Sequence, residues 1–101
     1  MADYTEKPKN WRDLPPEELA AFMTRKSEGY LPALLGFTLT SVTKDRVAAR
    51  MPVEKHHLAP NDYLHAASVI TLADTVCGMA TIVNLPEGAG GFTTIELKTN
   101  F

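Results

Sequence analysis

Residues 66–85 have the sequence AASVITLADTVCGMATIVNL, twenty mostly apolar residues without a proline. As an α-helix they would extend about 30 Å, which is enough to cross the hydrocarbon core of a membrane. Asp74 stands near the middle of the stretch, however, and a central aspartate costs about 2.5–3.5 kcal/mol in membrane insertion. The stretch therefore predicts a helix from about His65 to Asn84 that is buried inside a soluble protein and apolar almost all round.

The whole chain, residues 1–101, is long enough for one domain only. The 101 residues carry 10 basic and 12 acidic side chains, a net charge of −2, and 45% are hydrophobic. A domain this small buries only about 60–65% of its unfolded surface and has a thin core, so a partner subunit would help to stabilise it.

Charge and cysteine usage limit the partners and the compartment. The pI near 5.9 and the lack of a Lys/Arg run argue against nucleic acid or a membrane surface as partner. Cys77 is the single cysteine and has no internal disulfide partner, which favours a reducing compartment. Residues 1–10 are polar and lack the apolar core of a signal peptide, so we expect a cytoplasmic protein.

The N-terminal part predicts one surface helix after a polar segment. Residues 1–13 are expected to be poorly ordered. Pro15 and Pro16 suit a first helical turn, where no intrahelical N–H donor is needed. The helix then has a single apolar stripe and a stop at Gly29. The stripe is formed by Leu19, Phe22 and Met23.

From Gly36 the apolar residues recur at every second position. Residues 37–40 and 47–53 alternate in this way around the polar turn 43–46, which predicts an antiparallel hairpin with Met51 and Val53 in its second strand. Residues 56–63 form a loop in which Asn61 or Asp62 is available to cap the following helix.

Residues 86–91, PEGAGG, end the long helix, and residues 92–101 alternate again as a strand. Its faces are predicted to separate Ile95 and Leu97 from Thr94, Glu96 and Lys98, the last two being solvated neighbours. The order helix, hairpin, buried helix, strand predicts an α+β fold with a curved antiparallel sheet around the long helix. Three strands are few for such a sheet, so we expect the fold to be cut short after Phe101.

Asp74 is the sharpest candidate for chemistry, because an unpaired buried carboxylate costs several kcal/mol. A structural aspartate bonded to a neighbouring backbone or hydroxyl group is the alternative. At the helix start beside His65, the N–H of Ala66 or Ala67 could hold an anion or a developing oxyanion. There the alternative is a capping or packing histidine.

No metal site is expected. His56 and His57 lack a recognised ligand spacing, and Cys77 lies far along the helix. Cys77 is expected to pack on the apolar side of the helix rather than to act as a nucleophile.

Three segments together resemble the hotdog-fold acyl-CoA thioesterases of the phenylacetate-degradation (PaaI-like) type. They are HLAPNDYLHAA (57–67), LADT (72–75) and FTTIELKTNF (92–101), and the resemblance extends from about Gly36 to the end. It implies a hotdog fold, a homodimer or a dimer of dimers, and hydrolysis of an acyl-CoA thioester. Coenzyme A would be part of the substrate, with no further cofactor.

The resemblance also implies roles for individual residues. Asp74 would be general base or nucleophile, the Ala66 N–H would bind the thioester carbonyl, and Thr94 would hold the attacking water. His65 would shape the helix entry or bond the carbonyl. The substrate-binding candidates are Asn61, Ala67 and Thr75. The family usually has His-Gly-Gly where this chain has His65-Ala66-Ala67, and its usual asparagine position is occupied by Ala59, so that Asn61 would stand in.

Helix geometry adds an independent requirement. Asp74 follows Ala66 by eight residues, about 12 Å along a helix at 1.5 Å per residue. One carbonyl cannot touch both on the same helix, so the proposed site needs Asp74 from one chain and Ala66 from another. A hotdog acyl-thioester dehydratase using His65 with Asp74, and a non-catalytic acyl-CoA-binding protein, remain alternatives.

Overall fold

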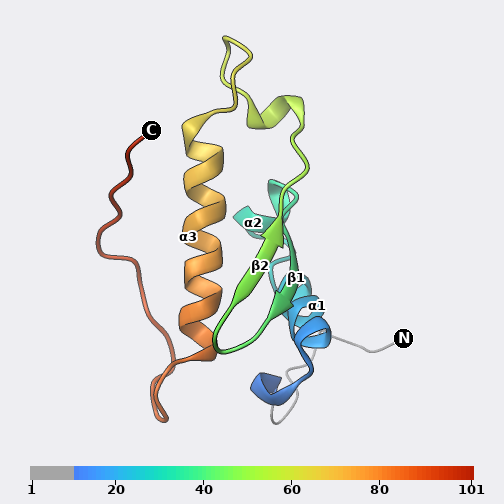
Figure 1. Cartoon of the computed structure of the whole chain (residues 1–101), viewed down its shortest axis with the longest axis vertical. Coiled ribbons are helices and arrows are strands. Elements are labelled where there is room, and N and C mark those ends of the chain that lie inside the picture. The colour runs from blue at the N-terminus through green and yellow to red at the C-terminus, as the bar shows by residue number, and fades with distance from the viewer. Residues whose placement is uncertain (1–10) are drawn as a thin grey trace.

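The computed structural model describes residues 11–101, so the expectation for residues 1–10 lies outside the described part. Helix α1 packs on strand β1 of a hairpin, and helix α3 lies against β2 (Figure 1). The architecture is α+β, as predicted, with a two-stranded antiparallel sheet. Its elements are η1 (Trp11–Asp13), α1 (Pro16–Lys26), α2 (Leu31–Leu34), β1 (Thr38–Val42), β2 (Val47–Arg50), η2 (Lys55–His57) and α3 (Ala66–Val83).

The apolar stripe of α1 forms the centre of the core. Leu19, Phe22 and Met23 are all buried, which confirms the sequence prediction for this helix. Trp11 is buried as well, with its ring centroid 5.5 Å from that of Phe22. The expectation that residues 11–13 lack order is therefore wrong, because a large aromatic side chain finds apolar cover there.

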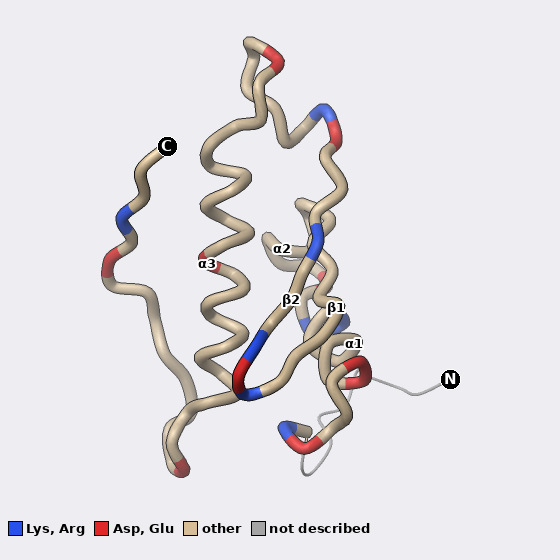
Figure 2. Tube along the Cα trace, viewed as in Figure 1, with Lys and Arg blue, Asp and Glu red and all other residues tan. Residues whose placement is uncertain are grey.

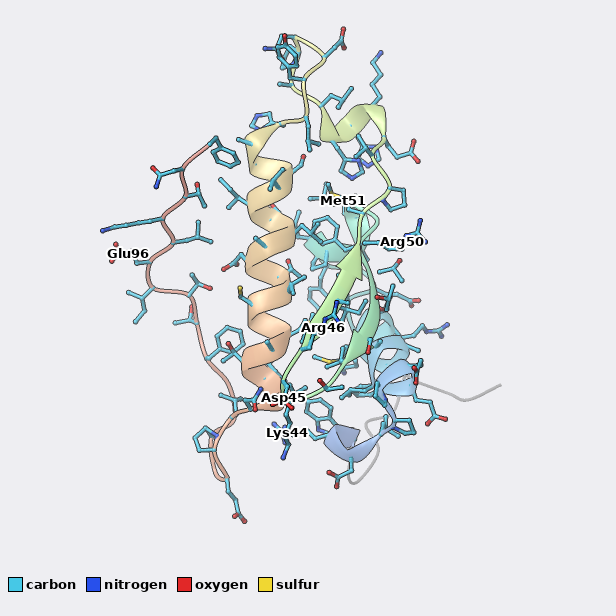
Figure 3. All side chains as sticks on the ribbon, in the orientation of Figure 1. Lys44, Asp45, Arg46, Arg50, Met51 and Glu96 are labelled. Carbon is cyan, nitrogen blue, oxygen red and sulfur yellow. The ribbon has the colours of Figure 1, made fainter. Side chains whose placement is uncertain are left out.

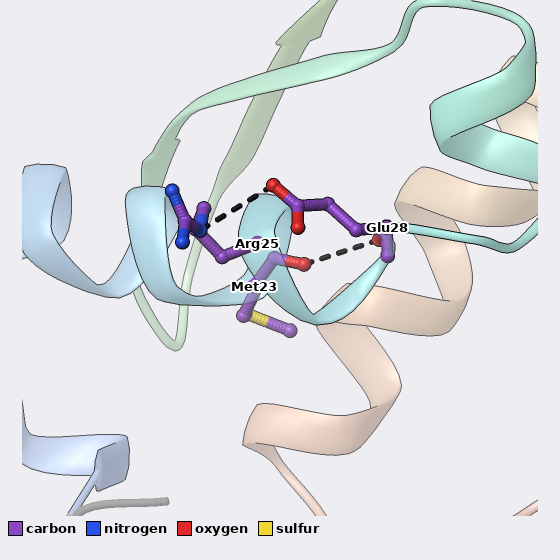
Figure 4. A network of polar contacts seen from close by, with 4 residues as sticks. Met23, Arg25 and Glu28 are labelled. Carbon is purple, nitrogen blue, oxygen red and sulfur yellow. Dashed lines mark hydrogen bonds and ion pairs between the residues drawn. The ribbon is translucent and has the colours of Figure 1, made fainter. Parts of the chain in front are cut away.

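Helix α1 ends at Lys26, three residues before Gly29, where the backbone φ of +86° suits glycine. Polar contacts close this end (Figure 4): the Ser27 hydroxyl donates to the Met23 carbonyl at 3.1 Å, and Arg25 pairs with Glu28 at 3.4 Å. The orphan carbonyls of the last turn thus acquire a partner.

The predicted hairpin is present but shorter than the alternation suggested. Its turn is closed by the Thr43 N–H, which donates to the Arg46 carbonyl at 2.8 Å, with Lys44 and Asp45 at the tip (Figure 3). The last strand pair joins Thr38 to Arg50, so Met51 and Val53 lie outside β2, contrary to prediction. Pro52 has no N–H to donate, and β1 offers no residue opposite these positions.

Helix α3 has the predicted bounds to within one residue. The other described segments do not enclose it, however, so the prediction that it is buried is wrong. Ser68 and Val83 are its only buried residues. The hairpin covers one side of α3, and the segment that follows α3 runs back along another side (Figure 1). Among the described residues, α3 is the one helix long and apolar enough to cross a membrane, a test that core helices of soluble proteins also pass.

The predicted strand at 92–101 is an exposed extended segment without strand pairing. A strand needs a partner edge, and α3 lies between this segment and the hairpin (Figure 1). Ile95 is 94% exposed. Glu96 and Lys98 form a solvated ion pair at 3.1 Å, as expected for neighbours on one face, and Glu96 points away from α3 (Figure 3).

Candidate active site at two positions on α3

The first position is the N-terminus of α3, which His65 caps. The His65 Nδ1 atom accepts a hydrogen bond from the Ala67 N–H at 2.9 Å. The prediction that Asn61 or Asp62 provides this cap is wrong: the Asn61 side-chain oxygen accepts from the Tyr63 N–H at 3.2 Å, and Asp62 adopts φ +69° within the loop. Both residues stabilise the turn itself, which leaves capping to the residue adjacent to the helix.

Because His65 occupies the Ala67 N–H, the two small residues at the helix start are not equivalent. The Ala66 N–H has no acceptor within residues 11–101, and Ala66 is exposed. The positive end of the helix dipole adds to the attraction of this N–H for an anion. Of the two candidate oxyanion donors, Ala66 is the one whose N–H remains free.

The sequence offers His57 only as a possible metal ligand, but in the structure it is buried and holds this region in place. His57 is 1% exposed; its Nδ1 accepts from the Glu54 N–H at 2.8 Å, and its Nε2 donates to the Leu35 carbonyl at 2.6 Å. The His57 carbonyl accepts from the Ser68 hydroxyl at 2.8 Å and from the His65 N–H at 3.0 Å. His57 thereby ties α2, η2 and the start of α3 together, and only its three-dimensional neighbours reveal this role.

The second position is the middle of α3, at Asp74. Asp74 is partly buried and is the one charged residue of α3 (Figure 2). The Thr94 hydroxyl, from the extended segment after α3, donates to Asp74 Oδ1 at 3.0 Å. Two residues twenty positions apart, both singled out from the sequence, are thus in direct contact. The contact also places the Thr94 face of the segment toward α3.

A cavity of about 220 Å³ lies beside the Asp74 carboxylate. Thr75 and Gly78 of α3, Pro32 of α2, and Thr94 line it together with Asp74. The Asp74 carboxylate, with one oxygen held by a hydroxyl, faces a space bordered mainly by apolar groups. Such a space can hold a small apolar group next to a potential base or nucleophile.

The two positions do not share a cavity within one chain. A separate cavity of about 230 Å³ lies at the start of α3, lined by His65, Ala67 and Ser68 among others. The helical rise separates Ala66 from Asp74 by about 12 Å. Ala67 borders the cavity at the start of α3, and Thr75 borders the cavity beside Asp74, while Asn61 lines neither.

No group of three or more metal-ligating side chains occurs among residues 11–101. Both ring nitrogens of His57 are already hydrogen-bonded, which removes it as a ligand. Cys77 is exposed, so the expectation that it packs in the interior is wrong. It lies on a side of α3 that no described segment covers closely enough to bury it.

Comparison with known proteins gives one indication of chemistry. No family model matches the chain, and no solved structure matches it. The chain is 34% identical over 82 residues to a Deinococcus radiodurans protein named "Putative esterase", an alignment that covers 77% of this chain and 51% of that protein. The chain thus spans about half the length of this curated relative, and it is similar there to a protein whose name denotes a hydrolase.

Proposed function

We propose that the chain forms the catalytic part of an acyl-CoA thioesterase with a hotdog fold. The observation that carries the proposal is the Asp74–Thr94 contact at 3.0 Å beside a cavity, on an otherwise apolar helix. The similarity to a protein named as an esterase supports hydrolysis in general. The thioester as the scissile group rests on the resemblance of the three sequence segments.

In this mechanism Asp74 acts on water or on the thioester directly. As a general base it removes a proton from water while the water oxygen bonds to the thioester carbon; the carbon–sulfur bond then breaks, and the proton passes to the coenzyme A sulfur. As a nucleophile its oxygen bonds to the same carbon, the carbon–sulfur bond breaks and coenzyme A leaves as the thiolate; water then hydrolyses the resulting anhydride to the free acid and the Asp74 carboxylate. Thr94 fixes the carboxylate and offers its oxygen to the water. The Ala66 N–H stabilises the oxyanion.

The distance between Asp74 and Ala66 makes a dimer part of the proposal. Two α3 helices that run antiparallel across a two-fold axis bring Asp74 of one subunit to Ala66 of the other and create two equal sites. The same pairing would cover part of the exposed surface of α3. Dimers of dimers are compatible with it.

Replacing Asp74 with Asn tests the catalytic assignment while it keeps the side-chain shape. We expect acyl-CoA hydrolysis, followed by thiol release, to fall by about 10²–10⁴-fold. Asp45→Asn, at the exposed hairpin turn, is the matched control and should keep full activity. Near wild-type turnover in Asp74→Asn would refute the role of Asp74. Incorporation of ¹⁸O into the Asp74 carboxylate in a single turnover in ¹⁸O water would establish the nucleophilic route with water attacking the Asp74 carbonyl, because the general-base route never labels this carboxylate.

Mixing two inactive variants tests the shared site. Ala66→Pro removes the N–H at the first helical position, where proline is tolerated and where His65 already has the extended backbone that precedes proline. We expect Ala66→Pro alone to lose about 10²–10³-fold in kcat. In a random mixture with Asp74→Asn, half the dimers hold one intact site, so activity should return to about a quarter of wild type. No recovery on mixing would contradict a site built from two subunits.

The geometry at the helix start disfavours the dehydratase alternative. Base catalysis by His65 requires a ring nitrogen with a free lone pair; the Nδ1 lone pair is used by the helix cap, and in the neutral ring Nε2 then carries the proton. A non-catalytic acyl-CoA-binding protein would instead show ligand-induced stabilisation without thiol release.

A further inference from the structure

The cavity beside Asp74 lies next to a larger one and shares three lining residues with it. This larger cavity, of about 420 Å³, lies between α1 and the C-terminal end of α3. Met79, Ile82 and Phe92 border both cavities. The larger volume falls in the range of small-molecule sites, whereas the space at Asp74 alone is below it. The two neighbouring cavities lie along α3, and the proposed reacting group borders the smaller one.

The larger cavity is lined mainly by apolar residues, with Lys26 and Ser27 at the end of α1 among its polar lining. Phe22 and Met23 of the core line its α1 side, and Leu85 lines its far end. Arg12 also borders it, but its Nε donates to the Ile82 carbonyl at 3.2 Å and its guanidinium stacks 4.5 Å from the Trp11 ring centroid. Asp74 and Ile82 are eight residues apart, which corresponds to about 12 Å along α3.

Gly78 lines the smaller cavity, and Phe92 lines both cavities. A Cβ atom added at Gly78 would lie 3.0 Å from the tip of the Phe92 ring. Phe92 is 44% exposed and belongs to the extended segment after α3, so the ring can move aside. Glycine at this position lets the ring lie against the helix.

We propose that the subunit that supplies Asp74 also binds the acyl chain of the substrate, which runs past Gly78 and Phe92 into the cavity between α1 and α3. This inference rests on the proposed thioesterase function and assigns its substrate class: thioesters of medium-length aliphatic acids. Gly78 and Leu85 determine the chain-length preference, Gly78 beside Phe92 and Leu85 at the far end.

Binding of non-hydrolysable thioethers to the full-length protein tests the assignment without the need for catalysis. The probes are S-butyl-, S-octyl- and S-dodecyl-CoA, measured by isothermal titration calorimetry. Each methylene that enters the cavity should tighten binding roughly threefold. We expect S-octyl-CoA to bind the wild type at least about tenfold more tightly than S-butyl-CoA.

Leu85→Trp narrows the far end and should remove most of this gain while leaving S-butyl-CoA affinity unchanged. Gly78→Ala displaces Phe92 and should change the octyl-to-butyl ratio several-fold. Leu34→Trp, on an exposed residue that borders neither cavity, is the matched control and should behave as the wild type. Equal affinity for butyl and octyl probes in the wild type, or a gain that survives in Leu85→Trp, would overturn the inference.

The outcome is separable from that of the proposed function. A chain-length gain that Leu85→Trp removes, without thiol release from acyl-CoA, would support the acyl cavity and refute the thioesterase. Hydrolysis that depends on Asp74 but shows no chain-length effect in binding or in kcat/KM would refute the acyl cavity alone.

Discussion

The two halves of the described chain use their apolar residues in opposite ways. Residues 11–50 bury most of them between α1 and the hairpin, where Phe22 is 3% exposed; Tyr30, Leu31 and Leu34, around α2, are the exposed exceptions. Residues 66–101 leave large apolar side chains in solvent, and Phe101 is 81% exposed. Hydrophobic patterning is equally clear in both halves. A hydrophobic pattern therefore specifies which face of an element favours burial. Burial itself requires a second surface that packs against that face.

The largest effect should come from the same substitution made in each half. Phe22→Ala opens a cavity in the core and should lower the free energy of unfolding by about 3–5 kcal/mol. Phe101→Ala should change it by less than about 0.5 kcal/mol, as expected for an exposed position. Urea unfolding followed by circular dichroism measures both. A loss above about 1 kcal/mol for Phe101→Ala would mean that the segment is covered in solution and that the contrast breaks down.

His57 joins the two halves, so its removal should weaken the boundary between them. His57→Phe keeps the size of the side chain but leaves the Leu35 carbonyl and the Glu54 N–H without their partner. We expect a loss of about 1–3 kcal/mol in unfolding free energy. His56→Phe, at the exposed neighbour, is the control. Equal stability of the two variants would show that the His57 hydrogen bonds contribute nothing net.

The Thr94 hydroxyl links the exposed half of the chain to Asp74, and its effect should appear in catalysis. Thr94→Val removes the hydroxyl donor to the carboxylate. We expect kcat to fall at least about tenfold, because a hydrogen bond to a charged group contributes about 1.5–3 kcal/mol, with little change in stability. Thr93→Val, one position away, should be silent. Equal kcat values in the two variants would place Thr94 outside the mechanism.

The smallest effects should be alike in both halves. Arg25–Glu28 and Glu96–Lys98 are ion pairs whose side chains are 46% exposed or more. Glu28→Gln and Glu96→Gln should each change the unfolding free energy by less than about 0.5 kcal/mol, and still less in high salt. A clear difference between them in thermal melts would show that one pair is more than a surface contact.

Local features of the fold could be predicted from the sequence. Pro16 starts α1, the polar residues 43–46 turn the hairpin, and the apolar run fixes α3, because caps, turns and helical periodicity act over a few residues. The strand at 92–101 could not be settled in this way. Its alternation is real, but strand pairing requires an edge whose position depends on the whole fold.

The features of the candidate site likewise separate into those that local sequence predicts and those that depend on the whole fold. Two features of the site follow from the sequence alone, since residue order and helical rise fix both. One carboxylate, Asp74, lies in an apolar helix, and Ala66 lies a helical turn or more away from it. Three other features depend on the tertiary structure. Thr94 donates a hydrogen bond to Asp74, and His57 is buried. His65 accepts from the Ala67 N–H, which leaves the Ala66 N–H free. These contacts join residues distant in the chain or choose between neighbours, and such choices depend on how separate elements pack.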